Sequence, residues 1–178
     1  PADYGNKHYV SLASVRAGNV IGGGDWALDR IIPDCIRAIE NNKVIEIRSP
    51  KAIRPWQHVL EPLGGYMLLA SKMWDEPTQY CEGWNFGPRT ESIANVWDVA
   101  SKLIHNYGKG ELKDVSDPNA LHEAKLLMLD INKAHFKLGW EPRMNIDQCM
   151  AMVADWYKRY QNEDVYNLCV EQINKYVG

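Results

Sequence analysis

Five polar side chains in the first half of the chain have types and spacings suited to an anionic, sugar-like ligand: Asn19, Arg30, Arg54, His58 and Asn85. A guanidinium presents a fork of fixed donors that matches phosphate oxygens. An asparagine amide can bond to sugar hydroxyls and phosphate oxygens alike. Two arginines and two asparagines near the ends of expected strands therefore indicate a phosphorylated or nucleotide-linked ligand.

Each of these residues also has a structural interpretation, which the sequence leaves open. Arg30 and Arg54 could form ordinary surface ion pairs, which contribute little to stability. Asn19 could serve only to hold a turn. His58 and its neighbour Trp56 are of types that pack more often than they catalyse.

Other kinds of chemistry find little support in the sequence. There is no G-x-S-x-G, and no serine has an evident base partner. The cysteines form no C-x-x-C pair and the histidines no zinc-binding spacing, so we do not expect a metal site. Cys35 and Cys149 fall among apolar helical positions, which predicts reduced packing residues.

A glycine-rich stretch at residues 16–26 (R-A-G-N-V-I-G-G-G-D-W) follows an apolar run and precedes a helical pattern. Such strand-to-helix connections present binding groups at the carboxyl ends of strands. The letters G-G-G-D-W-A also satisfy G-x-G-x-x-A, with Glu46 as a possible ribose-binding acid. However, polar residues 16–19 separate the strand from the glycines, and Asp25 would repel a pyrophosphate at the helix start. Trp26 is also too bulky for a close approach, so we favour a plain glycine turn.

The remaining pattern predicts alternating strands and helices. Residues 8–15 suggest a parallel strand buried on both faces, and residues 53–62 look too polar for a core strand. Ser92 is a candidate cap for one helix, and Asn145 with Gln148 suggests a capping box for another. Further strands are expected at residues 44–48, 83–86 and 126–129, and helices at residues 27–41, 63–74, 93–107, 131–138, 146–161 and 167–176.

The bulk properties point to one α/β unit without a basic surface. The chain has 178 residues, a net charge of -3 and a pI near 6.0, which disfavours nucleic acid or an anionic membrane surface as a partner. It has no apolar run of about 20 residues that could span a membrane, so we expect a cytoplasmic protein. Because it starts at Pro1 without methionine, we expect a processed chain or a piece of a longer one.

Three segments together resemble the nucleotide-sugar enzymes of the extended short-chain dehydrogenase/reductase family, in particular the 4,6-dehydratases that act on CDP-glucose. They are residues 15–34 (V-R-A-G-N-V-I-G-G-G-D-W-A-L-D-R-I-I-P-D), 53–66 (I-R-P-W-Q-H-V-L-E-P-L-G-G-Y) and 84–88 (W-N-F-G-P), and residues 138–142 (L-G-W-E-P) add a fourth match. The amino-terminal G-x-x-G-x-x-G and the Y-x-x-x-K pair of that family are absent from this sequence. The resemblance thus implies a carboxyl-terminal half: a late Rossmann strand and helix, plus the small α/β substrate-binding domain.

The resemblance further implies roles for individual residues. The intact enzyme would convert CDP-glucose to CDP-4-dehydro-6-deoxyglucose and water with bound NAD, using catalytic groups that are not on this chain. Residues 8–20 and about 53–74 would belong to the Rossmann part. Val20 would approach the nicotinamide end of NAD through its backbone. The residues that the resemblance places at the substrate are Asn19, Arg30, Ile45, Ile47, Arg54, Asn85 and, more loosely, His122.

Several alternatives stay open. A related dehydratase, epimerase or decarboxylase of the same fold would share most of these features. A free-standing nucleotide-binding module would use the G-G-G-D-W turn, and an interaction domain would need no small ligand at all. Relatives are commonly homo-oligomers, and we expect the strand at residues 8–15, lacking neighbours, to cause self-association or to be irregular.

Overall fold

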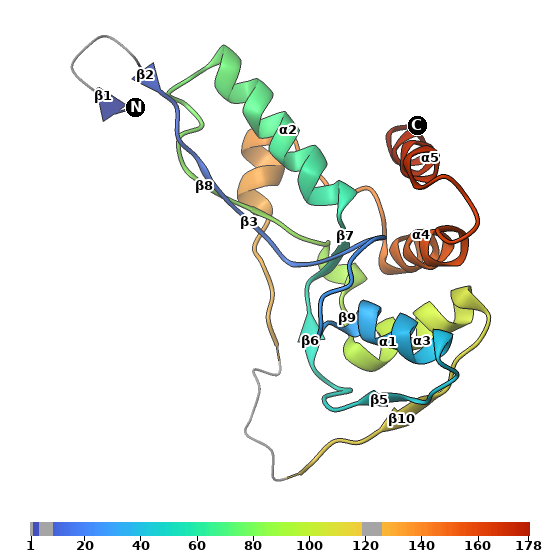
Figure 1. Ribbon diagram of the computed structural model, residues 1–178. Helices are drawn as coiled ribbons and strands as arrows, with labels where there is room; N and C mark the ends of the chain where they lie inside the picture. The colour runs from blue at the N-terminus through green and yellow to red at the C-terminus, as the bar shows by residue number, and fades with distance from the viewer. Residues whose placement is uncertain (1, 4–8, 119–125) are drawn as a thin grey trace.

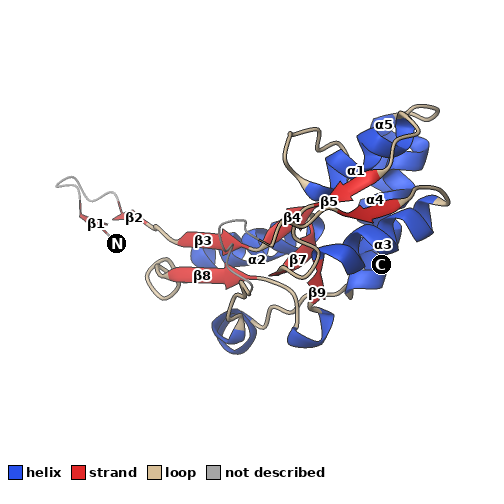
Figure 2. Ribbon diagram, turned by 90° about the horizontal axis from the view of Figure 1, so that it is seen from below, coloured by secondary structure: helices blue, strands red, loops and turns tan. Residues whose placement is uncertain are grey.

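The structure, a computed structural model, describes residues 2–3, 9–118 and 126–178 and has a mixed α/β fold. Two pairs of parallel strands run through its middle (Figures 1 and 2). Strand β3 (Ser14–Ala17) pairs with β8 (Gly83–Phe86), and β4 (Asn19–Ile21) pairs with β7 (Trp56–His58). A small antiparallel pair, β1 (Ala2–Asp3) with β2 (Tyr9–Val10), lies at the amino end.

The predicted first strand is wrong in its position. In place of one buried strand over residues 8–15, β2 ends at Val10 and β3 begins at Ser14. The polar residues that we expected to form a connection are themselves in strands, because β8 and β7 supply parallel partners up to Ile21. Gly18 divides β3 from β4, and a Cβ there would lie 2.2 Å from the carbonyl oxygen of Pro55. The chain can therefore approach Pro55 only through a glycine.

A second layer forms the larger hydrophobic core. Helix α1 (Ile31–Glu40) leads to β5 (Ile45–Ile47), which pairs in parallel with β10 (Leu112–Asp114). Helices α3 (Val96–Tyr107) and α4 (Ile146–Arg159) pack beside them (Figure 1). The large, fully buried side chains of this core include Ile32, Ile36, Ile39, Ile47, Leu103, Met150, Tyr157 and Leu168.

A smaller core lies under helix α2 (Leu60–Asp75), next to β8. Trp84 and Phe86 of β8 are buried, and Phe86 meets Trp140 edge-on with ring centroids 4.9 Å apart. The short helix η2 (Ala134–Leu138) closes this core on the other side, and it ends at Gly139 in a left-handed conformation.

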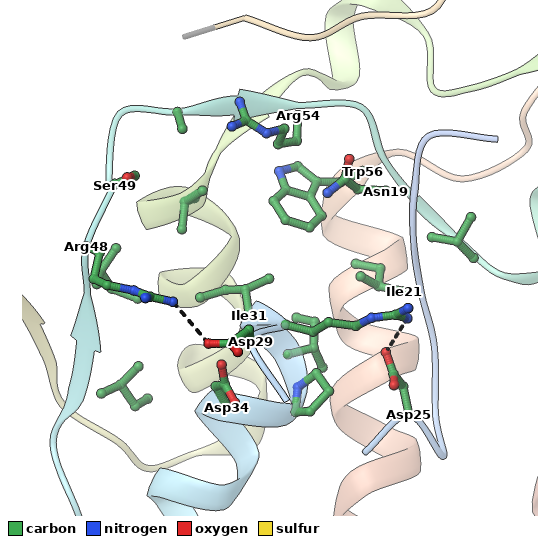
Figure 3. Close-up of a pocket in the computed structure, with 18 of the residues that line it drawn as sticks. Asn19, Ile21, Asp25, Asp29, Ile31, Asp34, Arg48, Ser49, Arg54 and Trp56 are labelled. Atoms are coloured by element: carbon green, nitrogen blue, oxygen red, sulfur yellow. Dashed lines mark hydrogen bonds and ion pairs between the residues drawn. The ribbon is translucent and has the colours of Figure 1, made fainter. Parts of the chain in front are cut away.

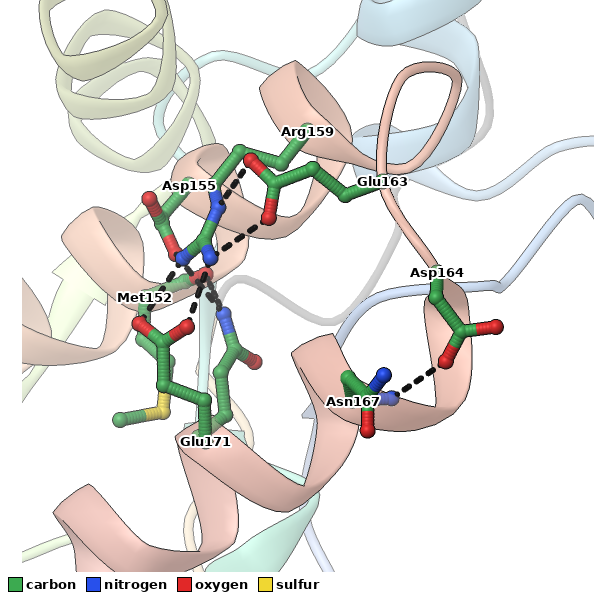
Figure 4. A network of polar contacts seen from close by, with 8 residues as sticks. Met152, Asp155, Arg159, Glu163, Asp164, Asn167 and Glu171 are labelled. Atoms are coloured by element: carbon green, nitrogen blue, oxygen red, sulfur yellow. Dashed lines mark hydrogen bonds and ion pairs between the residues drawn. The ribbon is translucent and has the colours of Figure 1, made fainter.

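The last two helices are held together by one arginine. Arg159 of α4 forms ion pairs with Asp155 at 3.1 Å, Glu163 at 2.7 Å and Glu171 at 2.6 Å (Figure 4). Glu171 lies on α5 (Val165–Val177), which Asp164 caps by accepting a hydrogen bond from the Asn167 N–H. The expected terminal helix is therefore confirmed.

The other expected elements are confirmed or corrected one by one. Asn145 and Gln148 form the expected capping box of α4. The cap of α3 is Asn95 and not Ser92, because the chain first forms the 3₁₀ turn η1 (Thr90–Ser92) and strand β9 (Ala94–Asn95). Residues 126–129 form only an isolated bridge, from Leu126 to Ile53.

The segment at residues 53–62 is the clearest error in the expected secondary structure. It contains β6 (Ile53–Arg54), which pairs antiparallel with β9, and the buried strand β7. We judged it too polar for a core strand, but Gln57 and His58 are both buried there. Pro62 stands in the first turn of α2, where proline is tolerated. Among the described residues, no helix is long and apolar enough to cross a membrane.

Candidate functional site

One cavity of about 590 Å³ lies where β4, α1, β5, β6 and β7 meet (Figure 3). Polar side chains at the ends of these elements surround it, and isoleucines from α1 and β5 contribute apolar wall. A pocket of this size, with apolar walls and a few convergent polar groups, suits a small ligand. The structure brings together here the predicted site residues Asn19, Val20, Arg30, Ile45, Ile47 and Arg54.

The strand pairing explains how residues far apart in sequence reach this cavity. Asn19 of β4 is the register partner of Trp56 in β7, and the Asn19 N–H donates to the carbonyl of Pro55 at 2.9 Å. Arg54 lies two residues before Trp56, and residues at that spacing on extended backbone share a face. Asn19, Arg54 and Trp56 therefore line the same cavity (Figure 3).

The arginines of the cavity are partly neutralised by aspartates. Arg30 pairs with Asp25 at 3.1 Å, and Arg48 pairs with Asp29 at 3.3 Å (Figure 3). The side chains of Arg30, Arg48 and Asp29 are more than half exposed, so water screens these pairs and they contribute little to stability. Arg54 is half-buried and donates to the carbonyl of Ile53 at 2.9 Å. The ion pairs of Arg30 and Arg48 are therefore weak ones, with which another anion could compete.

Strand β5 forms the apolar side of the cavity. Ile45 and Ile47 are buried and also belong to the larger core. Glu46, between them, points the other way and is exposed, as alternation along a strand requires. The two isoleucines can thus contact a flat apolar group without extra motion of the core.

The glycine turn does not form a dinucleotide cradle. A Cβ on Gly23 would lie 2.1 Å from the indole ring of Trp156, and one on Gly22 would lie 2.8 Å from Val59. These glycines therefore allow close packing against α4 and α2, which confirms the interpretation as a plain turn. Asp25 caps the turn by accepting from the Ala27 N–H at 3.0 Å.

Trp26, which follows this turn, docks on the aromatic residues of α4. Its ring lies 5.3 Å from Tyr157 and 5.4 Å from Tyr160, centroid to centroid. The Tyr157 hydroxyl donates to the carbonyl of Asp25 at 2.7 Å. The turn is thereby fixed to helix α4.

One predicted site residue of the described part, Asn85, is not brought into this cavity, and another cannot be placed. Asn85, on β8, accepts from Arg16 at 3.3 Å and donates to the carbonyl of Asp130 at 3.1 Å, and it is not among the residues that line the cavity. His122 lies outside the described residues.

Two buried titratable residues, His58 and Cys35, lie outside the cavity lining. His58 is buried, which lowers its pKa to about 4, and its Nδ1 accepts from the Leu60 N–H at 3.3 Å. Cys35 is buried in the core, and burial raises the pKa of its thiol to about 12. Burial supports the packing interpretation for both residues, although the Nε2 of His58 is buried without a hydrogen-bond partner among the described residues.

Sequence reasoning missed part of the cavity lining. Asp29 precedes α1, and Arg48 and Ser49 follow β5, yet no pattern marked them as converging residues. For Trp56 we favoured a packing role and left a functional one open, although the alternation of Arg54 and Trp56 would have placed both on the same face. A second cavity, of about 910 Å³, lies between α2, the loop at residues 139–145 and α5, and it contains none of the predicted site residues.

Comparison with known proteins shows what this chain resembles. It is 45% identical over 179 aligned residues to CDP-glucose 4,6-dehydratase of Salmonella typhimurium, with all of this chain and 50% of the relative aligned. The chain therefore spans about half the length of this relative. No family model matches the sequence.

Solved structures show the same fold. One is the dTDP-glucose 4,6-dehydratase of Bacillus anthracis in complex with NAD, at a TM-score of 0.68 and 19% identity, with 85% of this chain and 45% of that chain covered. Another is the UDP-glucuronic acid 4-epimerase of Bacillus cereus, with a TM-score of 0.68, 18% identity and coverage of 85% and 46%. The chain is thus similar along its whole length to half of a CDP-glucose 4,6-dehydratase, and its fold is that of the matching part of extended short-chain dehydrogenase/reductase dehydratases and epimerases.

Proposed function

We propose that this chain is the nucleotide-sugar-binding, carboxyl-terminal portion of an NAD-dependent CDP-glucose 4,6-dehydratase. The observation that carries the proposal is the convergence of six residues, expected at the substrate or cofactor from sequence alone, on one cavity. The whole enzyme would convert CDP-glucose to CDP-4-dehydro-6-deoxyglucose and water. Its catalytic groups would lie on the other half, so this chain alone would bind and not react.

The roles of the residues follow from their chemistry. Arg54 would bind the diphosphate through its fork of donors, and Asn19 would bond to the sugar or the diphosphate. Ile45 and Ile47 would contact the base. Arg30, at the mouth of the cavity, would exchange Asp25 for the anionic ligand. Asn85, which does not line the cavity, and His122, which lies outside the described residues, remain candidates for ligand contact.

The packing of the glycine turn gives no support to NAD binding there, since a Cβ on Gly23 would lie 2.1 Å from the ring of Trp156. We propose that NAD is held mainly by the other half, and that this chain adds only the backbone of Val20. Residues 8–20 and about 53–74 would then belong to the Rossmann part, in a cytoplasmic enzyme that forms homo-oligomers.

A related dehydratase, epimerase or decarboxylase is the alternative. The 45% identity to the CDP-glucose enzyme, against 16–22% to the structures of enzymes with other substrates, favours CDP-glucose. A module that binds NAD through G-G-G-D-W is disfavoured by the packing of Gly23.

Isothermal titration of the chain with CDP-glucose tests the proposal, with dTDP-glucose and NAD as separate titrants. We expect binding of CDP-glucose that Arg54→Ala abolishes. Arg89→Ala is the matched control, because Arg89 pairs with Glu141 away from this cavity. Binding of NAD alone, equal binding of dTDP-glucose, or unchanged binding by Arg54→Ala would contradict the proposal.

A further inference from the structure

The indole of Trp56 carries a hydrogen-bond donor that the fold does not use. Only 6% of Trp56 is exposed, and its Nε1 is shielded from solvent without a hydrogen-bond partner among the described residues. Burial removes the hydrogen bond that such a donor makes to water, and here no protein acceptor replaces it. This is unfavourable and uncommon in folded proteins. Such a group calls for an acceptor that is supplied from outside the fold.

The place of this donor indicates where that acceptor enters. Trp56 lines the cavity, opposite Asn19 in the β4–β7 pair and on the same face as Arg54. Figure 3 shows the indole on the cavity wall, with its nitrogen on the edge that faces Arg54. An oxygen that Arg54 binds would therefore be near the indole N–H as well.

We infer that Trp56 is a ligand-binding residue, and that its indole N–H donates to an oxygen of the diphosphate that Arg54 binds. This inference rests on the proposed function and adds to it a neutral donor beside the arginine. An indole N–H can donate to a phosphate oxygen without carrying a charge of its own. Its packing in the core restricts the orientations of the ring, so only a local shift is needed to expose the N–H to the ligand.

The chain offers a matched control in Trp84. This residue is also buried, with 1% exposed, but its Nε1 donates to the carbonyl of Tyr80 at 3.0 Å and it lies in the smaller core. Removing its N–H breaks a bond that already exists in the unliganded protein. Removing the N–H of Trp56 breaks none.

The experiment compares Trp56→Phe with Trp84→Phe in titrations with CDP-glucose and in urea unfolding. We expect Trp56→Phe to raise the Kd about ten-fold, equivalent to about 1.4 kcal/mol, and Trp84→Phe to leave it unchanged. Because phenylalanine also removes packing, benzothienylalanine is placed at each position as a second variant, since it keeps the two-ring shape and replaces N–H by sulfur. At position 56 it should raise the Kd without lowering the unfolding midpoint, and at position 84 it should lower the midpoint only.

The outcomes separate this inference from the proposed function. Binding by the wild type that both variants at position 56 retain would overturn the inference and leave the function standing. No binding by the wild type would overturn both. A lower unfolding midpoint with benzothienylalanine at position 56 would show an internal partner for the indole and overturn the inference. The ten-fold effect should persist when CDP is the titrant and vanish with cytidine; its absence with CDP would overturn the assignment to the diphosphate.

Discussion

The carboxylate of Glu61, in the first turn of α2, accepts a hydrogen bond of 2.9 Å from the hydroxyl of Tyr176, near the end of α5. It also accepts from the backbone N–H groups of Arg143 and Met144, at 2.9 and 2.7 Å. Glu61 is only 1% exposed, so water does not solvate its carboxylate. The three protein donors take the place of water as its hydrogen-bond partners. One carboxylate thus joins α2, the loop before α4 and the last helix.

Loss of one of these bonds should be measurable. We expect Tyr176→Phe to lower the free energy of unfolding by about 1.5–3 kcal/mol, the usual contribution of a hydrogen bond to a charged group. Tyr166→Phe, on the same helix but 75% exposed, should change it little. Urea unfolding followed by circular dichroism measures both. Equal stability of the two variants would show that the Tyr176 bond contributes nothing.

The glycine turn makes a second prediction about packing. Gly23→Ala places a methyl group 2.1 Å from the rigid ring of Trp156, so we expect a loss of about 1–3 kcal/mol from overpacking. Gly83→Ala is the control, because its new Cβ would lie 3.3 Å from the Ser14 hydroxyl, which can rotate away. Thermal unfolding of the two variants distinguishes them. If Gly23→Ala were as stable as the wild type, the glycine would have another role.

Burial of His58 predicts a pH dependence. Its pKa in the fold is about 4, against 6.5 for the free side chain, so the fold favours the neutral form. The free energy of unfolding is therefore unaffected by His58 above pH 6.5 and decreases as the pH falls toward 4, because the unfolded chain then binds the proton more readily than the fold does. Since one pKa unit corresponds to about 1.4 kcal/mol, the free energy of unfolding should decrease by about 3 kcal/mol over that interval.

The test is urea unfolding between pH 7 and pH 4. His58→Phe should flatten this decrease, whereas His105→Gln, at an exposed position on α3, should retain it. A decrease that persists undiminished in His58→Phe would assign the acid sensitivity to other groups.

The open edge of β3 predicts self-association of the isolated chain. Within the described part of the structure, β3 pairs with β8 alone, and the apolar side chains around it, Val10, Leu12 and Val15, are 49%, 76% and 39% exposed. Such an edge can pair with another chain. Leu12→Lys should therefore reduce association in analytical ultracentrifugation, and Leu28→Lys, at a site 77% exposed in a loop, should not. A wild-type chain that stays monomeric at high concentration would contradict this prediction.

The sequence correctly predicted those elements whose structure depends on residues close together along the chain. The strand Gly83–Phe86 stands between turn residues, and the capping box of α4 uses only residues within one helical turn. Gly108, in a left-handed conformation, ends α3 directly after residue 107, where the expected helix ends. In each case the determining atoms lie close together in sequence.

The errors arise where the partner strand is distant. β7 is a buried strand despite Gln57 and His58, because Gln57 donates to the carbonyl of Phe86 at 2.8 Å, a contact that sequence alone could not show. β10 was not expected, since its parallel partner β5 lies more than 60 residues earlier along the chain. The convergence of Asn19, Arg30 and Arg54 was indicated by residue type and by resemblance. The position of Trp56 opposite Asn19 follows from the register of β4 with β7, which the sequence does not show.

A crystal structure of the chain in complex with CDP-glucose would test the central claim most directly. We predict electron density for the ligand in the cavity lined by Asn19, Arg54 and Trp56, with the diphosphate at the Arg54 guanidinium and the base against Ile45 and Ile47. Density in the second cavity, between α2 and α5, with the first one empty, would contradict the account.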